Sequence, residues 1–88
     1  MGTPVGSFEY RLMKRLQSAL PTVTIYIETH NPDFLGCIIT IWDDEIQEKL
    51  ELRLPDKELH QWAEAEPLYI SKIAKYLKEA HRALRKES

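Results

Sequence analysis

Few residues of this chain have side chains that could do covalent or metal chemistry. Cys37 is the single cysteine, and it stands in the middle of an alternating apolar stretch, where a small core residue is far more common than a nucleophile. His60 and Glu64 are one helical turn apart, and His30 and Asp33 share a turn, so each pair brings together potential metal ligands. A metal site needs more ligands than either pair supplies, and the chain has no second cysteine and no two histidines four residues apart.

Two further patterns could bind a cation or a phosphate. The acidic run Asp43–Glu45 could hold a hard cation, but a turn between two strands favours exposed polar residues in any case. A phosphate-binding loop requires several glycines, whereas this chain has three, two of which lie in its first six residues. We therefore predict a non-catalytic protein without a cofactor and without a metal site.

The charge distribution indicates a class of partner. Residues 43–66 contain nine acidic and three basic residues, whereas residues 68–88 contain six basic and two acidic ones. The basic side chains that could contact phosphates, with those of the N-terminal segment included, are Lys72, Lys75, Lys78, Arg82, Arg85, Lys86, Arg11, Lys14 and Arg15. Alternatively, the cations of the C-terminal helix pair with the acidic middle, for instance with Glu58, Glu64 or Glu66. The formal net charge of −2 and the pI of about 5.9 disfavour nucleic acid as the partner.

An apolar surface is predicted on the side of the sheet that the helices leave open. Alternation along the strands puts Tyr26, Ile38, Thr40 and Trp42 on this side, where they form a patch. Either a terminal segment, such as the first residues or the helix before Pro67, folds over the patch, or another protein or a second copy of the chain covers it. Protein–protein association, including a homodimer, is thus the leading predicted function, and nucleic-acid binding through the basic C-terminal helix is the alternative.

An N-terminal helix is predicted over residues 8–20. Apolar residues recur every four positions from Phe8 to Leu20, which marks one face of an amphipathic helix. Ser7 is a suitable N-cap, and Pro21 ends the helix because its ring disfavours a helical conformation at the preceding residue. We expect residues 1–6 to be a flexible leader and residues 7–88 to be a single α+β domain.

Three strands are predicted at residues 22–29, 36–42 and 48–54. Each alternates in polarity, and the inward-facing residues are Val23, Ile25, Ile27, Cys37, Ile39, Ile41, Leu50, Leu52 and Leu54. The connections between the strands are short, which favours an antiparallel meander.

The C-terminal third is predicted to be helical. Asp56 can cap a helix that begins at Lys57. Pro67 then interrupts the apolar pattern, so it either kinks one long helix or occupies the first turn of a new one. The apolar stripe of the long helix consists of Ile70, Ile73, Ala74, Leu77, Ala80 and Leu84.

The predicted fold class is α+β with the order α-β-β-β-α. A three-stranded antiparallel meander carries the N-terminal helix and the long C-terminal helix, kinked or split at Pro67, on one face. This order resembles that of double-stranded-RNA-binding domains, and the stretch Ser71–Lys75 is similar to the lysine-rich start of their last helix. The chain lacks the His-Pro-type loop and the glycine-rich approach to that helix, so the resemblance implies a topology and no site residue is carried over.

A cytoplasmic location without a membrane span is expected. No apolar run approaches the length of about 18 residues that a transmembrane helix needs. The first seven residues lack the basic start and apolar stretch of a secretory signal. The lone cysteine agrees with a reducing compartment.

Overall fold

The computed structural model describes the backbone of residues 4–87 and the side chains of residues 8–87. Its elements follow the predicted order α-β-β-β-α, with additional short helices between the sheet and the last helix. They are α1 (Pro4–Ala19), β1 (Thr24–Glu28), β2 (Gly36–Asp43), β3 (Glu48–Pro55), α2 (Asp56–Gln61), the 3₁₀ turn η1 (Ala63–Ala65) and α3 (Glu66–Glu87). The α+β fold predicted from the sequence is therefore confirmed.

The three strands form one antiparallel sheet in the order β1-β2-β3, so β2 lies at its centre. Ile39 of β2 stands between Ile27 of β1 and Leu52 of β3. These three residues share one face because side chains alternate along each strand. Ile39 and its inward neighbours Cys37 and Ile41 belong to the buried core, as the alternation predicts.

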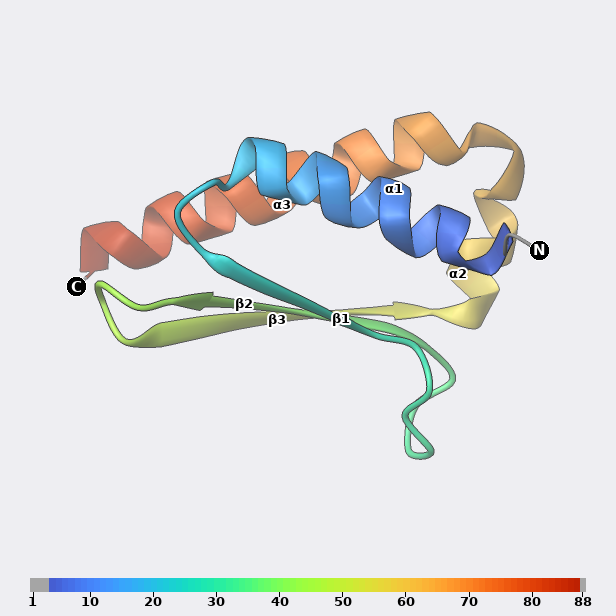
Figure 1. Ribbon diagram of the computed structural model, residues 1–88, viewed down its shortest axis with the longest axis horizontal. Coiled ribbons are helices and arrows are strands. Elements are labelled where there is room, and N and C mark those ends of the chain that lie inside the picture. The colour runs from blue at the N-terminus through green and yellow to red at the C-terminus, as the bar shows by residue number, and fades with distance from the viewer. Residues whose placement is uncertain (1–3, 88) are drawn as a thin grey trace.

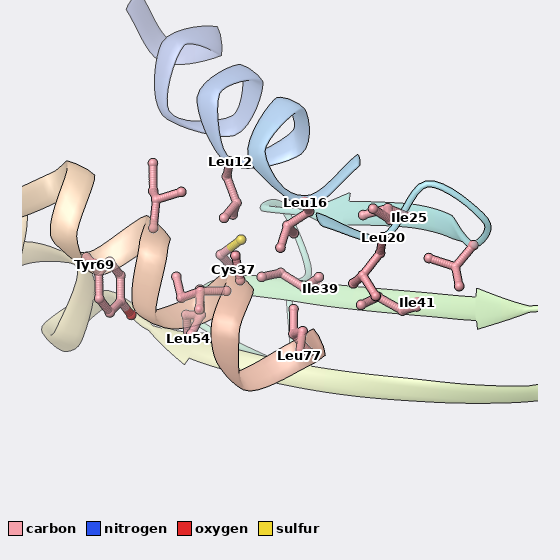
Figure 2. Packing of buried hydrophobic residues seen from close by; sticks show 14 residues of the cluster. Leu12, Leu16, Leu20, Ile25, Cys37, Ile39, Ile41, Leu54, Tyr69 and Leu77 are labelled. Atoms are coloured by element: carbon pink, nitrogen blue, oxygen red, sulfur yellow. The ribbon is translucent and has the colours of Figure 1, made fainter. Parts of the chain in front are cut away.

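Two helices cover one face of this sheet. α1 and α3, which we call the helix layer, lie side by side over the sheet, and the opposite face carries neither of them (Figure 1). Leu12 and Leu16 of α1 and Leu77 of α3 point toward Cys37 and Ile39 of β2 (Figure 2). Each of these five side chains is at most 1 % exposed. Full burial of one leucine or isoleucine stabilises a fold by about 1.5–3 kcal/mol, so this contact holds the two layers together.

α3 has one apolar and one charged side. Its buried residues are Tyr69, Ile70, Ile73, Ala74, Leu77 and His81. Lysines and arginines occupy much of the exposed side, as an amphipathic surface helix requires. None of the helices within residues 4–87 is both long enough and apolar enough to cross a membrane.

Two predicted helix caps are wrong. α1 begins at Pro4, so Ser7 lies inside the helix rather than at its N-cap. Proline suits a first helical position because its missing N–H would have no helical partner there. Asp56 is the first residue of α2, and Pro55 occupies the cap position without a side-chain hydrogen bond. Residues 1–3 of the predicted leader lie outside the described residues, and the others belong to α1.

Pro67 separates two helices instead of kinking one. α3 begins at Glu66, so Pro67 lies in its first turn, where a missing N–H costs no helical hydrogen bond. Across this corner the rings of Trp62 and Tyr69 stack, with their centroids 5.3 Å apart. The Tyr69 hydroxyl donates a hydrogen bond to Glu58 at 2.8 Å. These contacts fix the direction in which α3 returns over the sheet.

Candidate nucleic-acid interface

Positive charge is concentrated on the helix layer. α1 and α3 contain nine of the 12 lysines and arginines together with four acidic residues. The other segments contain three basic and ten acidic residues. The helix layer thus has a formal charge of +5 and the remainder −7, which gives the overall −2.

Two arginines of the predicted phosphate-contacting set are bound to carboxylates. Arg11 of α1 binds Glu66 at the start of α3, with Nη2 donating to Oε1 at 2.8 Å. Arg85 donates from Nη1 to Asp43 at 2.8 Å and from Nη2 to Glu45 at 2.6 Å. Arg11 therefore joins the two helices of the layer, and Arg85 joins α3 to the β2–β3 turn.

Two lysines of the set lie over aromatic rings. Lys72 Nζ is 5.3 Å from the centre of the Trp62 ring, and Lys14 Nζ is 5.2 Å from the centre of the Tyr10 ring. A cation–π contact at an exposed site contributes about 0.5–1 kcal/mol. Either ammonium group can therefore exchange its ring for a phosphate at a small cost.

The remaining five cations of the helix layer form no ion pair with any residue of the described chain, and they are Arg15, Lys75, Lys78, Arg82 and Lys86. The acidic middle does supply partners for Arg85. Of the three carboxylates proposed as partners of these cations, Glu66 binds Arg11 of α1, and Glu58 accepts a hydrogen bond from Tyr69. Within the described residues, neither forms an ion pair with a cation of α3. Most of the basic stripe of α3 is therefore available to a ligand.

A cleft opens at the end of the helix layer, where α1 leads into β1. Its volume is about 440 Å³, and it lies between Leu20–Thr22 and the last turns of α3. These two segments lie at the same end of the molecule as the C-terminus (Figure 1). Its lining contains His81 and no acidic residue, and its cations are Lys78, Arg82, Arg85 and Lys86.

A buried ionic cluster adjoins this cleft. His81 Nε2 lies 2.6 Å from Asp43 Oδ2, and Arg85 Nη1 lies 2.8 Å from the same oxygen. Asp43 is 1 % exposed and His81 is 7 % exposed. The hydrogen bond from His81 is the largest influence that lowers the pKa of Asp43, and burial opposes it. Since an ionised carboxylate can only accept, His81 Nε2 carries the hydrogen of this contact.

The sequence interpretation of Asp43 as part of an exposed polar turn is wrong. Asp43 is the last residue of β2 and has the inward parity of Ile39 and Ile41, which is a signal that could have placed it in the interior. His81 stands four residues after Leu77, on the buried side of α3. An inward carboxylate and an inward histidine in one small domain predict a contact, because buried charges require partners.

Few side chains of the described residues are arranged for covalent or metal chemistry. Within residues 8–87, no hydroxyl or thiol forms a hydrogen bond to His81. Cys37 is buried, and burial raises its pKa to about 11, so the reactive thiolate is scarce at neutral pH. His30 and His60 are exposed, and no group of three or more His, Cys, Asp or Glu residues in the described part could hold a metal ion.

The four residues of the predicted protein interface face away from the helices. Tyr26 is 61 % exposed, while Thr40 and Trp42 are half-buried. Trp42 Nε1 donates a hydrogen bond to Asp44 at 3.2 Å, so the indole is satisfied at the surface without a partner protein. Tyr26 and Trp42 are the aromatic part of this open face.

Ile38, the fourth residue of this interface, is only 5 % exposed. The β1–β2 loop descends on the open side of the sheet (Figure 1), and its Phe34 ring lies 5.6 Å from the guanidinium of Arg53, the cross-strand neighbour of Ile38. The loop thus covers part of the predicted patch. The helix α2, which was one expected cover, lies on the other side, where Leu59 and Trp62 pack against the core.

Comparison with models of protein families, with curated proteins and with solved structures finds no match to this chain. The resemblance to double-stranded-RNA-binding domains therefore remains one of element order. The charges, contacts and burial of the chain itself are the basis for a function.

Proposed function

We propose that this protein is a non-catalytic binding domain that lays its helix layer along the phosphates of a nucleic acid. The observation that carries this proposal is the separation of charge. Nine cations and four carboxylates lie on α1 and α3, against three cations and ten carboxylates elsewhere. Contacts between cations and phosphates supply most of the affinity of such complexes, whatever the base sequence.

The acidic remainder of the chain is compatible with this function. Glu28 and Glu51 belong to the open sheet face, opposite the helix layer, and the carboxylates of α2 and η1 lie near the start of α3, at the far end of the molecule from its last turns (Figure 1). Charges more than about 8–10 Å apart are largely screened at 0.1–0.15 M salt. Asp43 and Glu45, which lie close to α3, are already bound to Arg85. A polyanion on the helix layer is therefore governed mainly by the cations of that layer.

Several cations can engage a polyanion without breaking an ion pair. Arg15 is on α1, and four others recur at intervals of three or four residues along α3, from Lys75 to Lys86. This spacing puts the four on one side of the helix. The stripe is about 16 Å long at 1.5 Å per residue, which is enough to follow several phosphates of one strand.

The test is a titration of labelled single-stranded and duplex DNA and RNA. In a plot of log affinity against log salt concentration, each neutralised phosphate contributes about −0.7 to −0.9 to the slope. The five unpaired cations can neutralise about five phosphates. We therefore expect binding at about 50 mM salt that weakens by about 10²–10³ at 200 mM. Absence of binding to all four nucleic acids at the lower salt contradicts the proposal.

A matched pair of charge reversals tests where the nucleic acid binds. Lys75→Glu with Arg82→Glu should abolish binding, because both residues belong to the unpaired stripe. Lys49→Glu with Lys57→Glu makes the same change in net charge at exposed positions outside the helix layer and should leave binding nearly unchanged. Equal losses in the two double variants would show that net charge, and not the helix layer, determines affinity.

A second candidate is self-association through the open sheet face. It is favoured by the 61 % exposed Tyr26 beside Trp42. The same face carries two carboxylates and two cations, so it can be self-complementary about a two-fold axis; these residues are Glu28, Glu51, Lys49 and Arg53. Sedimentation should then show a dimer that Tyr26→Glu with Trp42→Glu dissociates. A monomeric wild type at high concentration would exclude it.

A further inference from the structure

We propose that the cleft between the α1–β1 turn and the end of α3 binds a terminal phosphate monoester, the group found at the end of a nucleic-acid strand. The proposal rests on the nucleic-acid function for the source of this phosphate. The next phosphates of the strand would then run toward Lys75 of α3 and Arg15 of α1, which lie outside the cleft lining.

The charge of the cleft matches that of a dianion. Four cations line it, and two carboxylates, Asp43 and Glu45, bind one of these cations, Arg85. The formal charge of these four cations and two carboxylates together is therefore +2, with His81 left out of the sum. A phosphate monoester carries about −1.5 to −2 at neutral pH. A phosphodiester within a strand carries about −1, so the cleft is better matched to the end of a strand than to its interior.

Arg85 is held in place before a ligand arrives. Its Nη1 and Nη2 each donate one hydrogen bond to a carboxylate, which leaves three of its five N–H groups. Its side chain is 41 % exposed, so these groups can reach a ligand. A side chain fixed by two ion pairs loses little rotamer freedom on binding, which favours affinity. Asp43, bound in turn to His81, is the buried support of this arginine.

The remaining lining suits an organic phosphate. Ala19, Leu20 and Pro21 supply the apolar part of the lining, beside Thr22. The volume of about 440 Å³ falls within the range of roughly 300–1,000 Å³ that is common for small-molecule sites. There is room for a phosphate and for the sugar attached to it. The C-terminal end of α3 contributes the equivalent of about half a negative charge, which the four cations outweigh.

The test compares single-stranded DNA oligonucleotides of one sequence that differ only at their ends. One carries a 5′-phosphate, one a 3′-phosphate, and one only hydroxyl groups, and each competes with a labelled strand at about 50 mM salt. We expect at least one phosphorylated strand to bind about tenfold more tightly, which corresponds to about one charge-assisted hydrogen bond. Equal affinity for all three strands would overturn the proposal while leaving the nucleic-acid function intact.

Exposed residues provide the variants, so that the fold is preserved. Arg82→Ala with Lys86→Ala should remove the preference for the phosphorylated end. Arg15→Ala with Lys75→Ala removes two cations outside the cleft lining, and it should weaken all strands by the same factor and keep the preference. Loss of the preference in the second variant as well would place the terminal phosphate elsewhere and overturn the proposal.

A titration with phenyl phosphate separates the cleft from the nucleic-acid function. Backbone amide signals of Leu20, Thr22 and residues 78–86 should shift in the wild type and remain unchanged in Arg82→Ala with Lys86→Ala. Such shifts without binding of any oligonucleotide would support the phosphate site and reject nucleic acid as its source. No shift, together with no preference among the strands, would reject the site whether or not nucleic acid binds the rest of the helix layer.

Discussion

Asp43 Oδ2 and His81 Nε2 lie 2.6 Å apart, and this contact joins the last residue of β2 to the C-terminal half of α3. Arg85 binds the same oxygen one turn further along α3. Breaking a buried ionic contact leaves an uncompensated charge in the interior, so the cluster fixes how α3 lies on the sheet. It also determines where the guanidinium of Arg85 stands in the cleft, which links the packing of the fold to its candidate site.

The stability of the protein should depend on the ionisation of Asp43. The pKa of Asp43 is lowered in the folded state, chiefly by His81, whereas in the unfolded chain it is about 3.9. Its stabilising effect is therefore complete above about pH 4 and is lost as the pH falls through the folded-state pKa. We expect Asp43→Asn to be less stable at pH 7, and the difference from the wild type to shrink as the pH falls below about 4. Urea unfolding at each pH measures the free energy of unfolding of both proteins. A difference between them that stays constant with pH would contradict the prediction.

The Asp43 cluster illustrates what a sequence pattern does not supply. Alternation in β2 and the four-residue spacing in α3 each mark an inward polar residue. Neither pattern says that Asp43 and His81, which are 38 residues apart, meet at the same end of the domain. That depends on the register of α3 over the sheet, which is set by core contacts and by the corner at Trp62 and Tyr69. The cations of the site could be listed from the sequence, but the cleft could not.

The sheet, in contrast, was predictable in detail because its pattern is local. Alternation identifies the inward residues of β2, and the short connections predict its antiparallel neighbours. The same reasoning put Ile38 on the open face, where it does lie. It did not predict that Ile38 would be only 5 % exposed, on the side of the sheet where the β1–β2 loop brings Phe34 to Arg53. Cover by an irregular loop has no periodicity from which it could be predicted.

Two leucines of β3 should differ in the cost of truncation. Leu54 is 3 % exposed within the core, whereas Leu52 is half-buried. Leu54→Ala should destabilise the domain by about 2–5 kcal/mol, the range for a buried leucine, and Leu52→Ala should cost less because solvent can partly fill the space. Chemical denaturation of both variants measures the difference. A neutral effect of Leu54→Ala would remove β3 from the core.

Gly36 at the start of β2 should tolerate no side chain. Its φ is +148°, and a Cβ added there would lie 2.2 Å from the carbonyl oxygen of Leu54 in the adjacent strand. Gly36→Ala should therefore cost at least about 1–3 kcal/mol, since the backbone must move. Each kcal/mol lowers Tm by roughly 4–8 °C in a domain of this size. Leu35→Ala is the matched control, because the neighbouring Leu35 is 80 % exposed, and an equal loss in Tm would contradict the steric explanation.

Cys37 should make the folded state less stable at high pH. Burial raises the pKa of its thiol from 9.0 to about 11, so the folded protein keeps a proton that the unfolded chain releases between these values. Stability is unaffected below the unfolded-state pKa and falls as the pH rises toward the folded-state pKa. At about 1.4 kcal/mol per pKa unit, the wild type should lose about 2 kcal/mol relative to Cys37→Ala between pH 9 and pH 11.

The thiol of Cys37 should also react slowly with a disulfide reagent in the folded protein. At pH 8 most of it is protonated, and its side chain is 1 % exposed, so modification requires the core to open. We expect the rate to be lower than in urea by a factor of 10² or more, since opening a core position costs several kcal/mol. Leu16→Ala, which removes a side chain from the same core, should accelerate the reaction in proportion to its loss of stability. Rapid labelling of the folded wild type would show that Cys37 is accessible and would contradict its place between α1 and the sheet.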